Sequence, residues 1–134
     1  EILGADGIFS EDLVKLGGKA VEGIKFSGFF HYTSKSPVAQ KFVAAYRKRF
    51  SGAKGLPSDP DAWSAQTYDC VQLLKIAIER GGQTRLGIRN ALEKIGQGTP
   101  AYDGVTGKHV FDKNGDMQKP LLMLTVRGGK ITSL

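Results

Sequence analysis

The 134-residue chain has a single cysteine and two histidines, and this scarcity excludes several kinds of site. Because Cys70 is alone, no disulfide can form within the chain. Cys70 also lies in an apolar stretch with helical spacing, which predicts a buried, inert thiol rather than a nucleophile. His31 and His109 do not stand at metal-ligand spacing. We therefore expect a protein that is not an enzyme and that carries no metal and no cofactor, and an enzyme that uses Cys70 or a histidine, paired in space rather than in sequence, is the less favoured alternative.

Long hydrophobic runs and clustered charge are missing as well. No apolar stretch approaches the roughly 20 residues that a membrane-spanning helix needs. The first residues lack the basic and apolar pattern of an export signal, and the chain starts without methionine, so we expect Glu1 to mark a processing or engineered boundary. The net charge of +6 is scattered and has no interleaved aromatic rings, which argues against a nucleic-acid partner.

The residues that are present indicate one globular domain of the α/β class. Hydrophobic residues make up 40% of the chain and charged residues 24%, as in ordinary globular proteins. Apolar residues at helical spacing predict helices, and apolar runs bounded by turn residues predict strands. The expected helices are 11–22, 37–50, 62–80 and 85–95. The expected strands are 24–30, 105–111 and 121–126, together with a first strand that ends at Leu3 and a last strand that starts at Ile131.

The predicted helix at 62–80 is apolar almost all round. This pattern predicts that other parts of the protein cover most of its surface. Trp63 stands in the first turn of this helix, directly after a loop rich in proline and aspartate. An aromatic ring at that place either packs at the edge of the core or faces a ligand, and the sequence alone leaves both interpretations open.

Asp6 lies in a predicted bend between the first strand and the first helix. Gly4 and Gly7 allow a tight turn, and Ser10 is a good N-cap for the helix that follows. The bend places Asp6 at the carboxyl edge of a strand, where open α/β sheets bind ligands. Its carboxylate can accept hydrogen bonds from an ammonium group, or it can simply cap the turn.

Residues 112–116 superficially resemble a calcium-binding loop because they include Asp112, Asn114 and Asp116. In a true loop of that kind glycine follows the third acidic ligand and a glutamate comes later. Here Gly115 precedes Asp116, and no glutamate follows. The Asn-Gly pair predicts a hairpin turn instead.

A series of segments resembles the type I periplasmic solute-binding proteins, and most of all the branched-chain amino acid (Leu/Ile/Val) receptors of ABC importers. No single motif is decisive, but the segments follow the family order over nearly all of the chain. They are residues 4–10, 18–23, 42–46, 62–69, 74–82, 102–107 and 111–116.

The resemblance implies part of a two-lobed, doubly wound α/β fold that closes like a jaw on a small solute, with a β-hairpin near its carboxyl end. Complete members are much longer, so we expect the carboxyl-terminal part alone. Residues 1–32 would belong to the second lobe, 33–118 to the first, and 119–134 would return as strands to the second. The chain would then cross a hinge near residues 31–33.

The resemblance also implies the ligand-binding residues. Asp6 matches the acidic residue that receives the α-ammonium of an amino acid, and Trp63 matches an aromatic residue that closes over the ligand from the opposite lobe. Phe9 matches a variable position beside them. The implied function is the periplasmic solute-binding component of an ABC importer, which binds an amino acid or a related small molecule and docks on the membrane subunits. A cytoplasmic ligand-sensing regulator with the same fold is the alternative.

The apolar helix at 62–80 leads to one more expectation. In the family, its cover comes largely from the amino-terminal lobe, which this chain lacks. We therefore expect the isolated chain to pair with a second copy, as a homodimer or a swapped dimer that exchanges elements about residues 31–33.

Overall fold

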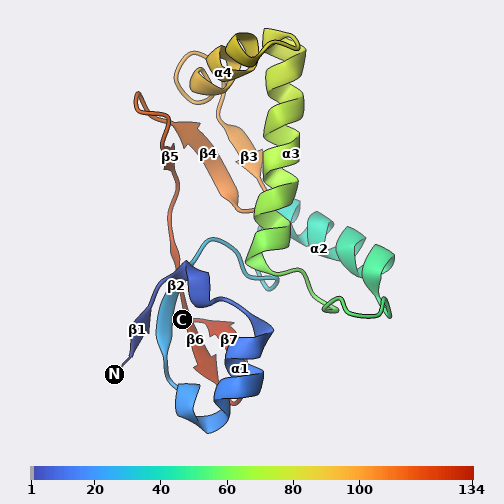
Figure 1. Cartoon of the computed structure of the whole chain (residues 1–134), viewed down its shortest axis with the longest axis vertical. Coiled ribbons are helices and arrows are strands. Elements are labelled where there is room, and N and C mark those ends of the chain that lie inside the picture. Colours follow the sequence, from blue (N-terminus) through green and yellow to red (C-terminus); the bar gives the residue numbers. More distant parts are fainter. Residues whose placement is uncertain (1) are drawn as a thin grey trace.

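The computed structural model describes residues 2–134, which form an elongated molecule with two parts (Figure 1). A four-stranded sheet with α1 makes the lower part, and a three-stranded sheet with α3 and α4 makes the upper part. The helices are α1 (Glu11–Gly17), α2 (Pro37–Phe50), α3 (Ala62–Gly81) and α4 (Arg85–Glu93), with 3-10 turns η1 (Asp6–Ile8) and η2 (Gly18–Val21). The strands are β1 (Leu3–Gly4), β2 (Lys25–Gly28), β3 (Tyr102–Gly104), β4 (Gly107–Phe111), β5 (Met117–Gln118), β6 (Leu122–Arg127) and β7 (Lys130–Ser133).

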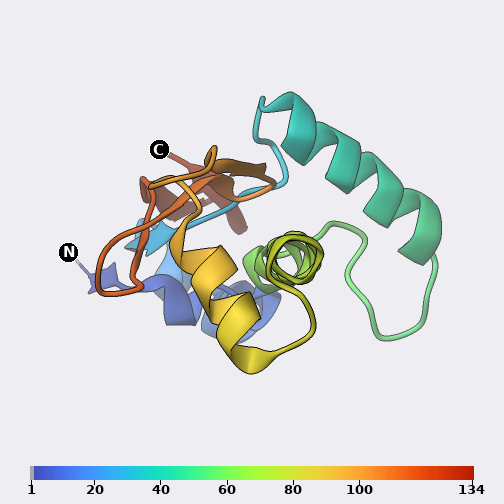
Figure 2. The same cartoon turned by 90° about the horizontal axis from the view of Figure 1, so that it is seen from above.

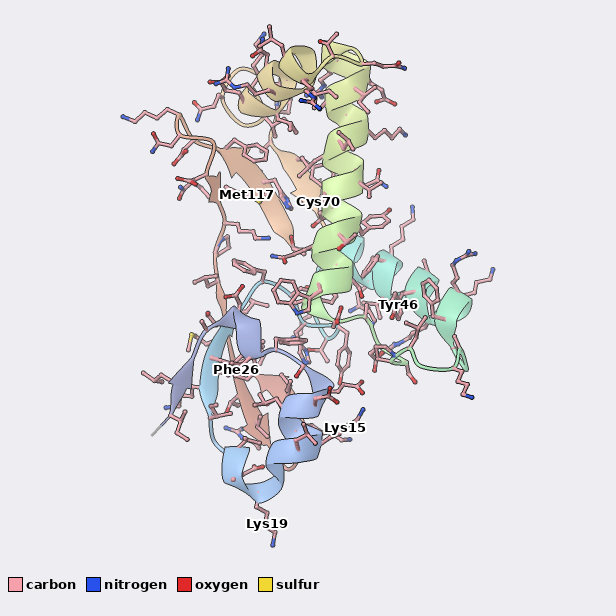
Figure 3. The ribbon with its side chains drawn as sticks, viewed as in Figure 1. Lys15, Lys19, Phe26, Tyr46, Cys70 and Met117 are labelled. Carbon is pink, nitrogen blue, oxygen red and sulfur yellow. The ribbon has the colours of Figure 1, made fainter. Side chains whose placement is uncertain are left out.

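The lower sheet joins the two ends of the chain. Its strand order is β1-β2-β6-β7, with β1 parallel to β2 and the other neighbours antiparallel. Phe26 of β2 stands opposite Leu124 of β6, and neither side chain is exposed to solvent. Phe26, labelled in Figure 3, belongs to a core that Leu13 and Val14 of α1 pack against. A mixed α/β fold is therefore present, as the sequence predicts.

The upper part combines the antiparallel sheet β3-β4-β5 with α3 and α4. Seen from above in Figure 2, α3 points along the view, α2 projects to one side, and both sheets lie toward the other. The crossing of α3 and α4 is close because Gly81 faces the backbone of Gly87, and a side chain on either glycine would collide with the other residue. Within residues 2–134, no helix is long and apolar enough to cross a membrane.

The chain passes between the two parts twice, through residues 29–36 and through residues 119–121. His31 anchors the first crossing: its Nε2–H donates to the carbonyl of Ile131 in β7 at 3.1 Å, and its Nδ1 lies 2.7 Å from Thr33 Oγ1. The expected domain boundaries fall at these crossings. Whether the two parts belong to two lobes of a longer protein stays a prediction.

Several predicted elements have different bounds in the structure. The helix expected at 11–22 ends at Gly17, because Gly18 has a positive φ of 50° and the chain continues as a 3-10 turn. The strand expected at 24–30 covers only 25–28, and the last helix ends at Glu93. The strand expected at 105–111 starts only at Gly107 as β4, because residues 105–106 form the tight turn that separates it from β3.

Residues 2–134 do not cover α3 on most sides, and the expectation that an amino-terminal lobe supplies the rest of the cover stays a prediction. The buried face of α3 contains Ala65, Asp69, Leu73 and Ala77. On other faces, large apolar side chains are exposed: Trp63 (49%), Tyr68 (43%), Val71 (58%) and Leu74 (46%).

The prediction of a buried Cys70 is wrong. The thiol is free and exposed on α3, labelled in Figure 3. Cys70 lies next to Val71 and four residues before Leu74, and both of these side chains are exposed. Helical spacing predicted the helix, but it could not show which of its faces the rest of the chain leaves uncovered.

Candidate ligand-binding site

The bend between β1 and α1 leaves the Asp6 carboxylate without an internal role. Backbone hydrogen bonds hold the bend, with Phe9 N–H donating to the Asp6 carbonyl at 3.0 Å. Ser10 caps α1, because its hydroxyl accepts from Leu13 N–H at 3.1 Å. The Asp6 side chain is half-buried and makes no hydrogen bond or ion pair with any other residue of 2–134. The interpretation of Asp6 as a side-chain cap therefore has no support in the structure.

Trp63 approaches the same place from α3. Asp61 caps this helix by accepting from Ser64 N–H at 2.7 Å, which fixes the direction of its first turn. Trp63 follows in that turn with about half of its surface exposed. Phe9 belongs to the lower part and is buried. Its ring packs edge-to-face on Phe26, with the ring centres 6.1 Å apart.

These three residues line one shallow surface depression between η1, the end of β2 and the start of α3, which offers about 0 Å³ of space for a water-sized molecule in this structure. All three predicted residues line it, and so both parts of the molecule contribute to its wall. The lining residues are Asp6, Phe9, Gly28, Phe29, Ala62, Trp63 and Gln66. One carboxylate and one carboxamide thus lie among aromatic rings, and these groups can contact a cationic end and an apolar body once the depression opens to admit a small molecule.

The sequence reasoning missed Phe29 and Gln66, although each had a signal. Gln66 follows Trp63 by three residues on α3, so the two share a helix face. Phe29 directly follows β2, which runs parallel to the strand that leads to Asp6. Because the carboxyl ends of parallel strands meet at one sheet edge, Phe29 belongs beside Asp6. The Gln66 carboxamide has no hydrogen-bond partner among the described residues and is half-buried.

A second polar cluster holds α3 to the β3–β4 hairpin. Asp69 is 1% exposed and accepts hydrogen bonds from Val105 N–H, Thr106 N–H and Thr106 Oγ1, each at 2.8 Å. Burial, followed by the Asp69 charge, raises the pKa of Tyr102 to about 12. Burial lowers the pKa of His109, whose Nδ1–H donates to the Gly107 carbonyl at 2.7 Å. Every polar group here is bonded internally, so the cluster is structural.

The described residues contain no group of three or more histidine, cysteine, aspartate or glutamate side chains that could hold a metal ion. The loop at 112–116 is the hairpin turn that the sequence predicts. Asp112 Oδ1 accepts from Asn114 N–H at 2.8 Å and from Asp116 N–H at 3.0 Å, and these backbone bonds lower the pKa of Asp112. Its carboxylate therefore serves the turn.

The buried histidines predict a loss of stability in mild acid. Burial lowers the pKa of both His31 and His109 from the ordinary value of about 6.5. Below that pH the unfolded chain binds more protons than the folded chain, so the free energy of unfolding should fall from about pH 6.5 down through the lowered values. Urea titrations at pH 7.5 and about pH 5.5 measure this change. The decrease should be smaller in H31Q and H109Q, and equal decreases in all three proteins would contradict the assignment.

Comparison with known proteins identifies the family that this chain resembles. The family described as periplasmic binding protein matches residues 2–130. The leucine-binding protein LivK of Thermotoga maritima is 31% identical with a TM-score of 0.82, over 99% of this chain and 36% of that one. LivJ of Streptococcus pneumoniae, solved with isoleucine, is 30% identical with a TM-score of 0.80, over 97% of this chain and 35% of that one.

A more distant structure shares the fold alone. The solute-binding protein of R. palustris in complex with benzoate is 21% identical with a TM-score of 0.72, over 99% of this chain and 35% of that one. No curated protein sequence matches the chain. This chain spans about a third of the length of these structures.

These matched proteins are solute-binding proteins rather than enzymes. The family match over residues 2–130 and the mixed sheet of the fold support the same assignment. The chain belongs to the periplasmic binding protein family and corresponds to part of a type I member.

Proposed function

We propose that this chain is the carboxyl-terminal part of the solute-binding component of an ABC importer, and that its depression receives the ammonium end of an amino acid. The observation that carries the proposal is the Asp6 carboxylate, which has no side-chain partner among residues 2–134 and lines the same depression as Phe9 and Trp63. A charge-assisted hydrogen bond to an ammonium group would satisfy it. The names of LivK and LivJ, with leucine and isoleucine, support an amino acid as the ligand.

The placement of the site supports binding coupled to closure. Asp6 and Phe9 belong to the lower part, and Trp63 and Gln66 belong to α3 of the upper part. A solute that touches both groups stabilises the arrangement in which they lie close together. In the longer protein the membrane subunits of the importer would recognise that closed form in the periplasm. An export signal encoded upstream would support this role, whereas a fused DNA-binding segment would support a regulator instead.

A ligand screen on the full-length protein tests the proposal. Amino acids should raise the apparent thermal stability, by about 2.7 kcal/mol when the ligand concentration is 100 times Kd. The matched control for leucine is 4-methyl-2-oxopentanoate, which keeps the side chain and the carboxylate but lacks the ammonium group. We expect a clear shift with leucine or another amino acid and a much smaller shift with its oxo-acid. Equal shifts for both members of such a pair would contradict the role of Asp6.

We also propose that the isolated chain associates with a second copy through the exposed face of α3. Apolar surface stays exposed to water at Trp63, Val71 and Leu74. This exposure costs about 25 cal/mol of free energy per Å². Sedimentation at micromolar concentrations should show a dimer, and Cys70 on the same helix should react more slowly with a maleimide as the concentration rises. A monomer with concentration-independent labelling would contradict the proposal.

A further inference from the structure

Lys119 connects the two crossings between the parts of the molecule. It lies in the second crossing, between β5 and β6, and its side chain is half-buried. Its ammonium stands 4.5 Å from the centre of the Phe29 ring, which belongs to the first crossing. The distance is within the range of a cation–π interaction, whose strength rises when water is partly excluded. Phe29 itself lines the depression with Asp6 and Trp63.

The same ammonium is fixed to the upper part by a directed hydrogen-bond chain. Lys119 Nζ donates to Thr106 Oγ1 at 2.9 Å, and that hydroxyl donates in turn to Asp69 Oδ2 at 2.8 Å. Asp69 is buried in α3, the helix that carries Trp63. Burial lowers the pKa of Lys119, while the negative charge of Asp69 favours its protonated form. The lysine therefore has a fixed position relative to one wall of the depression and touches a ring of the other wall.

We propose that Lys119 is a positioning residue for ligand binding, which holds the Phe29 ring in the wall of the depression from the opposite crossing. The proposal rests on the ligand site described above. Loop and element-terminal residues that lead into a crossing are those that absorb the change in backbone dihedral angles when two parts of a protein close. A ring fixed by Lys119 is in place before the ligand arrives, so less freedom is lost on binding. Without the cation, the same ring has to be ordered by the ligand.

The test is a double-mutant cycle on ligand affinity in the full-length protein. K119M keeps the length of the side chain but removes the cation, and F29L removes the ring. Isothermal titration with L-leucine, or with the amino acid that gives the largest thermal shift, should show K119M weakened about 5- to 30-fold. The double variant K119M/F29L should bind no more weakly than F29L alone, because the cation acts through the ring. K119R should recover most of the lost affinity.

K113M is the matched control, because Lys113 is an exposed lysine of the 112–116 turn, away from the depression. It should bind like the unmodified protein. K119Q replaces K119M if the latter does not fold, as judged by circular dichroism. An affinity of K119M within twofold of the parent protein, independent effects of K119M and F29L, or no recovery in K119R would each overturn the inference. Absence of amino-acid binding by the parent protein would instead contradict the proposed function.

Discussion

Replacement of Asp6 by asparagine in the full-length protein should weaken binding of an amino acid by about 2–5 kcal/mol, or at least about 30-fold in Kd. The carboxylate has no partner among residues 2–134, so a ligand ammonium would be its first strong contact. Asparagine keeps the size of the side chain but loses its charge. The loss includes the penalty of leaving the ammonium buried beside a neutral group. Isothermal titration calorimetry measures the effect.

Ser10→Ala is the matched control for this experiment. Ser10 lies in the same bend, and its hydroxyl caps α1 rather than lining the depression. The variant should lose about 1 kcal/mol of stability with little change in affinity. An unchanged affinity in D6N would remove the ammonium role and leave the carboxylate without a function in binding.

Replacement of Asp69 by alanine should destabilise the protein by about 3–5 kcal/mol. The carboxylate accepts from two backbone N–H groups and from the hydroxyls of Thr106 and Tyr102, and all of these donors would lose their acceptor. Each buried donor left without a partner costs about 1–3 kcal/mol. Because domains are stable by only about 5–15 kcal/mol, D69A should unfold at a much lower urea concentration.

Two further variants distinguish the hydrogen bonds that Asp69 accepts from the effect of simply removing a negative charge. Thr106→Val removes only the hydroxyl and should cost about 1 kcal/mol. Asp103→Ala removes an exposed carboxylate of β3, on the same hairpin, and should change the free energy of unfolding by less than about 0.5 kcal/mol. Similar urea midpoints for D69A and D103A would show that Asp69 does not anchor the hairpin.

Local signals predicted the helices better than the strands. The bounds of α2 and α3 follow from Pro37 in the first turn of α2, from the Asp61 cap of α3 and from the glycines at the end of α3, all of which act within a few residues. The turn at residues 105–106 has glycines on both sides, Gly104 and Gly107, but its position also depends on a distant contact. It is held by Asp69, 36 residues earlier in sequence, which binds Val105 N–H. A contact of that range cannot be found from spacing within a short window.

The candidate site likewise combines residues that the sequence indicated with residues that only the structure reveals. The resemblance supplied Asp6, Phe9 and Trp63, and the structure places all three at one depression. The role of each in binding remains a prediction. Lys119 carried no sequence signal, because its importance comes from Phe29 and Thr106, which reach it from separate elements. The exposure of Cys70 likewise depends on which elements are absent around α3, and residue spacing contains no such information.

The first and last strands of this chain lie in one sheet, so the sheet can fold only after both have been synthesised. β2 is held between the two-residue strand β1 and the longer β6, and the backbone of β7 accepts from His31, 100 residues away in sequence. During synthesis, the lower sheet therefore cannot form until almost all of this segment has left the ribosome. Pairings of such high contact order form slowly. The lower sheet is therefore the part of this segment that we expect to form last.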